Sequence, residues 1–159
     1  MSKCVFAGCF DPFTNGHLDV VKRLSEAFDE VYVVVSKNVE KKLVLDGEQR
    51  FDLVKKSINL PNVQVFLHEG LLVDFCKNHQ VNCIVKGIRN IFDYDYETLQ
   101  AKVNKEIGKI ETLFLPCAAQ YAFVSSSFVR EMFSLKREVR DYIPAEIYDE
   151  VKKAYSPKN

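Results

Sequence analysis

The chain has 159 residues, of which 47% are hydrophobic and 28% charged, a length and balance typical of one globular domain with a sizeable core. Its 22 basic and 22 acidic residues give a formal net charge of zero, which argues against a nucleic-acid-binding protein because phosphate backbones select for a basic excess. We therefore predict a single domain over residues 1–159 with no nucleic-acid partner. A small phosphate ligand needs only a local cationic pocket, which an overall charge balance still allows.

Strand-like and helix-like segments alternate along the chain. Short apolar runs predict strands over residues 4–7, 31–35, 63–67, 83–85 and 110–115. Apolar residues at helical spacing predict helices over residues 16–28, 47–58, 71–79, 93–107, 126–133 and 145–154. Strands that are apolar on both faces and separated by helices indicate a doubly wound α/β fold, in which a five-stranded parallel sheet has helices on both faces. Ligands of such folds bind at the carboxyl ends of the strands.

The cysteines are odd in number and form no C-x-x-C pair, so they predict neither a disulfide framework nor a zinc site. They are Cys4, Cys9, Cys76, Cys83 and Cys117. The first residues are too polar for a signal peptide. The longest apolar stretches have only the length of a strand, which is too short to span a membrane. We therefore expect a cytoplasmic protein in a reducing compartment, with no membrane partner.

The segment Thr14-Asn15-Gly16-His17 lies between the first predicted strand and the first predicted helix. With Thr14 as the N-cap, free backbone N–H groups and the helix dipole form an anion site in the first turn. Gly16 lets a phosphate approach closely. His17 can donate to a phosphoryl oxygen, and its first-turn position is expected to lower its pKa and leave a neutral N–H donor. The alternative, favoured for an isolated Gly-His pair, is a capping turn with a surface histidine. The pattern is neither a Walker P-loop nor G-x-G-x-x-G.

Three further segments at strand ends or helix starts carry cations or serines. They are Lys41 and Lys42 after the second strand, residues 86–89 (Lys-Gly-Ile-Arg) after the fourth, and residues 125–130 (Ser-Ser-Ser-Phe-Val-Arg) before a helix. Lys86 and Arg89 suit phosphate binding, and Arg130 lies one helical turn beyond Ser127. Each segment alone is better explained by surface charges or N-capping serines, so only their combination indicates a phosphate site. The acidic segment 93–97 fits no calcium loop and is interpreted as a solvated helix start.

Taken together, these segments resemble the phosphopantetheine adenylyltransferase family, which belongs to the nucleotidyltransferases with an H-x-G-H or T-x-G-H motif. The resemblance runs nearly end to end, through G-x-F-D-P-x-T-N-G-H, the lysine loop, K-G-I-R, D-Y-x-Y-E and F-V-S-S-S. It implies a Rossmann-like nucleotidyltransferase fold. It also implies transfer of the adenylyl group of ATP to 4′-phosphopantetheine, giving dephospho-coenzyme A and pyrophosphate in coenzyme A biosynthesis. Mg²⁺ with ATP, a homohexamer and feedback inhibition by coenzyme A are implied as well.

The resemblance assigns roles to the matching positions. The catalytic residues that it implies are His17, Lys41 and Arg89. The residues implied around ATP are Cys9, Phe10, His17, Gly87, Ile88, Arg89, Glu97, Tyr121, Ala122, Phe123, Val124, Ser125, Ser126 and Ser127. The residues implied on the side of the acceptor, 4′-phosphopantetheine, are Cys9, Lys41, Leu72 and Lys86. No residue is implied as a metal ligand.

The chain departs from the family pattern at two positions. Threonine or serine usually stands where this chain has Cys9, and arginine where it has Lys86. A hydroxyl contact is thereby lost at Cys9, and lysine keeps the charge of arginine without its bidentate fork. We therefore expect the departures to weaken acceptor binding more than ATP binding. Two alternatives stay open: another adenylyl- or cytidylyltransferase of the same superfamily, and a non-catalytic nucleotide sensor.

Overall fold

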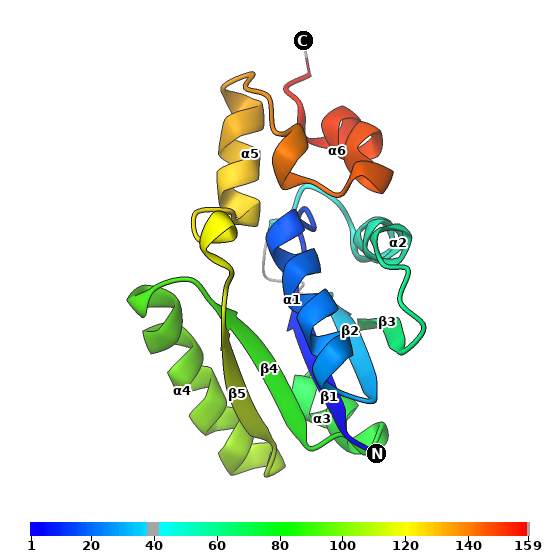
Figure 1. Cartoon of the computed structure of the whole chain (residues 1–159), viewed down its shortest axis with the longest axis vertical. Coiled ribbons are helices and arrows are strands. Elements are labelled where there is room, and N and C mark those ends of the chain that lie inside the picture. The colour runs from blue at the N-terminus through cyan, green and yellow to red at the C-terminus, as the bar shows by residue number, and fades with distance from the viewer. Residues whose placement is uncertain (38–41, 159) are drawn as a thin grey trace.

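The computed structural model describes residues 1–37 and 42–158 and has one parallel sheet at its centre (Figure 1). The strands are β1 (Lys3–Gly8), β2 (Glu30–Ser36), β3 (Val63–His68), β4 (Cys83–Ile88) and β5 (Glu111–Pro116). They lie in the order β3-β2-β1-β4-β5. The chain therefore moves outward from β1 to β3 and returns to place β4 beside β1. This confirms the predicted doubly wound five-stranded sheet, and its switch point lies between β1 and β4.

Helices connect the strands and continue after the last of them. They are α1 (Asn15–Ala27), α2 (Gly47–Ser57), α3 (Leu72–Asn78), α4 (Ile91–Gly108), α5 (Ser126–Ser134) and α6 (Tyr148–Tyr155), with 3₁₀ turns at Ala119–Tyr121, Arg140–Tyr142 and Ala145–Ile147. Figure 1 shows α5 and α6 side by side beyond the upper end of the sheet, where β1 leads into α1. Within the described residues, no helix combines the length and the apolar character needed to cross a membrane.

The alternating side chains of the central strands build a core on each face of the sheet. Cys4 and Phe6 of β1 pack in a cluster that also contains residues of α1, α2, α5 and α6. Val5 and Ala7 point to the other face, where the cluster contains residues of α3. Burial of strand residues on both sides explains why these strands read as continuous apolar runs.

Some boundaries differ from the sequence-based expectation. Strand β4 extends to Ile88, so Lys86 and Gly87 belong to the strand and not to the loop after it, because they pair with Phe114 and Leu115 of β5. Helix α4 begins earlier than predicted, because the side chain of Asn90 accepts hydrogen bonds from the backbone of the first turn. The helix predicted over 145–154 divides into the 3₁₀ turn Ala145–Ile147 and α6.

Gly108, the last residue of α4, has room for no side chain. A Cβ built there would lie 2.7 Å from Cβ of Val73 on α3. We therefore predict that Gly108→Ala lowers the free energy of unfolding by about 1–3 kcal/mol through overpacking.

The next residue, Lys109, ends the helix with φ 58°, a left-handed conformation that glycine adopts without strain. Lys109→Gly should therefore raise the free energy of unfolding by about 1 kcal/mol. Urea denaturation measures the free energy of unfolding of both variants. Equal stability of Gly108→Ala and Lys109→Gly would contradict the close packing at Gly108 and the strained backbone at Lys109.

Candidate active site

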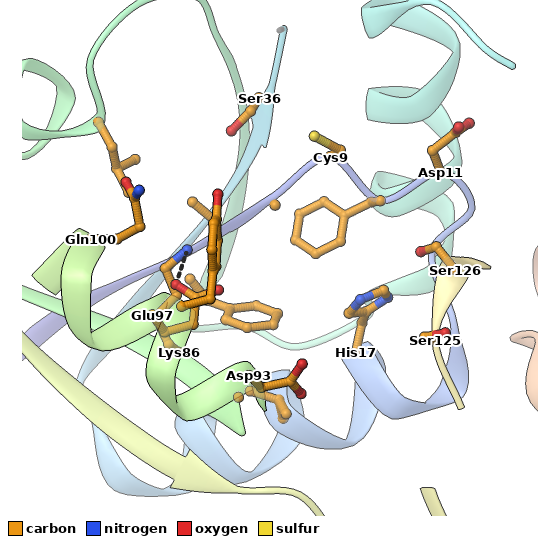
Figure 2. Close-up of a pocket in the computed structure, with 18 of the residues that line it drawn as sticks. Cys9, Asp11, His17, Ser36, Lys86, Asp93, Glu97, Gln100, Ser125 and Ser126 are labelled. Atoms are coloured by element: carbon orange, nitrogen blue, oxygen red, sulfur yellow. Dashed lines mark ion pairs between the residues drawn. The ribbon is translucent and has the colours of Figure 1, made fainter. Parts of the chain in front are cut away.

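A cavity of about 760 Å³ lies at the switch point, at the carboxyl ends of β1 and β4. Figure 2 shows His17, Lys86, Glu97 and Ser125 arranged around it. It therefore brings together segments that are far apart in the sequence. The predicted site residues that line it are Cys9, Phe10, His17, Leu72, Lys86, Gly87, Arg89, Glu97, Tyr121, Val124, Ser125, Ser126 and Ser127. Ile88, Ala122 and Phe123 are not among the lining residues, and Lys41 lies outside the described residues.

His17 and Thr14 cap the beginning of α1 reciprocally. The Thr14 hydroxyl accepts from the His17 main-chain N–H at 3.3 Å, and Nδ1 of His17 accepts from the Thr14 main-chain N–H at 3.0 Å. A ring nitrogen that accepts from a backbone N–H carries no proton itself. The neutral ring therefore carries its proton on Nε2. Figure 2 shows the ring projecting from α1 toward the cavity.

Aromatic rings surround the imidazole of His17. The Phe13 ring is stacked against it with centroids 5.4 Å apart, and Phe10 meets it edge-on at 5.1 Å. Burial, and to a smaller extent the positive charge of Arg89, lower the pKa of His17 from 6.5 to about 4. We expected a lowered pKa from the helix dipole alone, so the larger cause differs from that expectation. His17 is neither a surface residue nor charged at neutral pH.

The cations of the cavity are held by carboxylates from α4. Arg89 donates to both carboxylate oxygens of Asp93, from Nε at 2.9 Å and from Nη2 at 3.1 Å. Lys86 Nζ lies 3.4 Å from Oε2 of Glu97, the pair drawn in Figure 2. Asp93 and Glu97 are one helical turn apart, which places both on the cavity side of α4. The interpretation of segment 93–97 as a solvated helix start is therefore wrong for these two residues and holds for Asp95, which is exposed.

The serine segment is bonded to the loop between β1 and α1. Ser126 Oγ donates to the carbonyl of Pro12 at 2.7 Å, and Ser125 Oγ caps α5 by accepting from a backbone N–H. Arg130 donates to the carbonyl of Asp11 at 2.6 Å and to the hydroxyl of Ser127 at 3.2 Å. The predicted proximity of Arg130 and Ser127 is confirmed. Two helix starts, those of α1 and α5, thus face one cavity and offer free N–H groups to anions.

Two buried charged residues near the cavity were missed by sequence reasoning. Arg50 of α2 is only 2% exposed, and its guanidinium donates to the carbonyls of Cys9 at 2.5 Å and Ser36 at 2.9 Å. Asp11 is only 3% exposed. Asp11 could have been noticed from the sequence, because it lies in a Phe-Asp-Pro segment directly after β1. No local pattern distinguishes Arg50 from a surface arginine of an amphipathic helix.

Comparison with known proteins assigns this chain to a family. The family model for cytidylyltransferase-like proteins matches residues 5–132. The chain is 43% identical to a phosphopantetheine adenylyltransferase of Streptomyces coelicolor over 145 residues, which is 91% of each chain. It is 38% identical to a phosphopantetheine adenylyltransferase of Finegoldia magna over 159 residues, covering 99% of this chain and 98% of the relative.

A solved structure supports the fold independently. The nicotinic acid mononucleotide adenylyltransferase of Plasmodium falciparum superposes with a TM-score of 0.69 over 96% of this chain and 98% of that one. The two sequences are only 15% identical, so this likeness concerns the fold alone. The family model and the two relatives carry the assignment further: this chain belongs to the phosphopantetheine adenylyltransferases, within the cytidylyltransferase-like proteins.

Proposed function

We propose that the chain transfers the adenylyl group of ATP to 4′-phosphopantetheine and so produces dephospho-coenzyme A and pyrophosphate. One observation carries this proposal: a neutral histidine donor, three cations (Lys86, Arg89 and Arg130) and two helix starts converge on one cavity. The relatives named phosphopantetheine adenylyltransferase match nearly the whole chain and favour this acceptor.

The reaction is an in-line displacement at phosphorus. An oxygen of the acceptor phosphate forms a bond to the α-phosphorus of ATP, while the bond from that phosphorus to the oxygen bridging the β-phosphate breaks. The attacking phosphate already carries charge at neutral pH, so the protein needs no general base. Its task is to position two anions and to stabilise the charge that develops between them. Neutral donors and cations around the cavity suit this task, and a nucleophile–base pair is not required.

His17 acts on the α-phosphate in this mechanism. Its Nδ1 is engaged by Thr14, so Nε2–H is the donor that remains for a phosphoryl oxygen. Because the ring is fixed by capping and by stacking on Phe13, little reorganisation accompanies the reaction. A donor fixed before the reaction stabilises the transition state more than a mobile one.

The cations bind the phosphate groups of the two substrates. Before the substrates bind, the carboxylate partners hold the cations in place. Arg89 and the segment Tyr121–Ser127 belong on the ATP side, where Gly87 leaves room for a close approach. Lys86 and Leu72 belong on the acceptor side, together with Cys9 and with Lys41, which lies outside the described residues. An incoming phosphate competes with Asp93 and Glu97 for Arg89 and Lys86, so each ion pair loosens as substrate binds.

Further properties of the family are extended to this chain as proposals. Mg²⁺ accompanies ATP and is held mainly by its phosphates and by water. The described residues contain no cluster of three or more His, Cys, Asp or Glu side chains that could hold a metal ion. A cytoplasmic location and feedback inhibition by coenzyme A, which contains the adenylyl and phosphopantetheine groups that the reaction joins, complete this part of the proposal.

A homohexamer is also proposed, and the exposed surface of α4 and β5 supports self-association. Helix α4 buries only Gly108 among its residues, whereas large apolar side chains remain exposed on it and on the neighbouring strand. Those that do not line the cavity are Ile91, Phe92, Leu99 and Leu113. Apolar side chains gathered in this way favour a protein interface.

Pyrophosphate release tests the acceptor. We expect release from ATP and Mg²⁺ with 4′-phosphopantetheine and none with nicotinate mononucleotide, because the two relatives that match nearly the whole chain carry the first activity in their names. Release only with nicotinate mononucleotide would retain the chemistry and replace the substrate. ATP binding without release, with either acceptor, would favour the nucleotide sensor.

Replacing His17 tests its role in the transition state. We predict that His17→Ala lowers kcat about 100- to 1,000-fold, the usual cost of losing one such donor. The KM for ATP should change about threefold or less, because the lost bond matters mainly in the transition state. His17→Gln is the matched control for folding, since glutamine at this position preserves a capping box. Equal losses in kcat and in ATP affinity would count against the role.

The lowered pKa of His17 predicts a pH dependence of stability. Between pH 6.5 and about 4 the unfolded chain binds a proton at this residue that the folded chain does not. Stability from this group is therefore fully present above pH 6.5 and is lost as the pH falls toward 4. Urea midpoints at pH 7 and pH 4.5 should differ more for the wild type than for His17→Gln. Identical pH dependence in both proteins would show that His17 titrates normally.

A further inference from the structure

The last helix of the chain reaches the loop that follows the first strand. The hydroxyl of Tyr155, on α6, donates to Oδ1 of Asp11 at 2.5 Å across 144 residues of sequence. Both residues are buried, with 9% and 3% of their surfaces exposed. Burial, and then the hydrogen bond to Asp11, raise the pKa of Tyr155, so the hydroxyl keeps its proton and remains a donor. The contact joins the C-terminal segment to the loop that lines the cavity.

The carboxylate of Asp11 binds a second segment as well. Oδ2 accepts from the main-chain N–H of Val44 at 3.1 Å, and Oδ1 accepts from that of Leu45 at 3.4 Å. Figure 2 shows the carboxylate directed away from the middle of the cavity. The carbonyl of Asp11, by contrast, accepts from Arg130 of α5. The side chain of Asp11 therefore holds segment 44–45, and its main-chain carbonyl accepts from Arg130, whose Nη1 also lies 3.9 Å from Oδ2.

Segment 44–45 carries one wall of the cavity. Leu43, directly before it, lines the cavity together with Ser36 and Leu72. Arg50 connects this segment to its neighbours from outside the cavity. Its Nε donates to the carbonyl of Leu45 at 3.1 Å, and its Nη1 donates to the carbonyls of Cys9 and Ser36. Leu72 and Cys9 belong to the acceptor side of the proposed site, so the Asp11 carboxylate supports that side.

We propose that Tyr155 and Asp11 are positioning residues that set the acceptor side of the cavity through the main chain of Val44 and Leu45. The proposal rests on the proposed function, since it assigns one wall to the acceptor. Neither residue needs to touch a substrate. The C-terminal helix α6 thereby acquires a role in acceptor binding. We expect ATP binding to depend more on Arg130 and Ser126, whose closest contacts are to the main-chain carbonyls of Asp11 and Pro12.

A purely structural role for Tyr155 makes a different prediction. Its ring is stacked against Phe133 with centroids 6.4 Å apart, and a phenylalanine would keep that packing. If packing were its only contribution, removing the hydroxyl would lower stability and leave both Michaelis constants unchanged. If the hydroxyl orients Asp11, its loss frees the carboxylate to turn away from the Val44 and Leu45 amides, and acceptor binding weakens selectively.

The test compares two Tyr→Phe variants of the full chain. Tyr155→Phe removes the bond to Asp11, whereas Tyr148→Phe removes an equally short 2.5 Å bond to Glu138 from the same helix, away from the catalytic loop. We expect Tyr155→Phe to raise the KM for 4′-phosphopantetheine about tenfold, as loss of a hydrogen bond to a charged group permits. The KM for ATP should stay within about twofold, and Tyr148→Phe should leave both constants within the same limit.

Hydrogen exchange supplies a readout that does not depend on turnover. The Val44 and Leu45 amides should exchange faster in Tyr155→Phe than in the wild type, and should be unchanged in Tyr148→Phe. Asp11→Asn, which keeps the shape of the side chain, should reproduce the acceptor effect and carries the test if Tyr155→Phe does not fold.

An unchanged acceptor KM with unchanged exchange, or equal increases in both Michaelis constants, would overturn the proposal. Absence of pyrophosphate release by the wild type would instead overturn the proposed function, and the exchange measurement would still test the link from Tyr155 to segment 44–45.

Discussion

The main-chain N–H of Thr14 donates to Nδ1 of His17 at 3.0 Å, and the chemistry of the cavity depends on this hydrogen bond. It satisfies an N–H group that would otherwise lack a partner at the helix start. It also leaves the only ring proton of neutral His17 on Nε2, and it fixes the direction of the ring. A glutamine or glutamate would cap the helix as well, but neither is a rigid ring that stacks on Phe13. Histidine at this position therefore combines a helix cap with a fixed neutral donor.

The cations of the cavity pose an electrostatic problem that α4 solves. Lys86 and Arg89, two positive side chains at the carboxyl end of β4, repel one another, and Arg89 also disfavours a proton on His17 by lowering its pKa. Asp93 and Glu97 neutralise Arg89 and Lys86 at distances of 2.9 and 3.4 Å. Because both pairs keep some solvent contact, their desolvation cost is moderate and a phosphate can displace the carboxylates. The acidic residues thus hold the cations ready without binding them irreversibly.

The sequence alone predicted the sheet, its parallel character and the meeting of the motifs at strand ends, because those depend on apolar periodicity and on topology. It also predicted that Thr14 caps α1, because capping depends only on the residues next to the helix start. The residue pattern did not predict that Asp93 faces the cavity, because the facing strand decides which side of α4 is covered. Glu97 was expected there only from the family resemblance. Arg50 and Tyr155 escaped notice because their partners are a main-chain carbonyl of Cys9 and the carboxylate of Asp11, both distant in sequence.

The departure of Cys9 from the family pattern is best understood through its main chain. Arg50 is buried, and its Nη1 donates to the Cys9 carbonyl at 2.5 Å and to the Ser36 carbonyl at 2.9 Å. A buried guanidinium must satisfy its donors, because an unpaired buried charge is costly. The backbone at Cys9 is therefore fixed from outside the cavity and independently of its side chain. A different side chain at this position would therefore leave the shape of the loop intact, because Arg50 holds the main chain and does not contact the thiol.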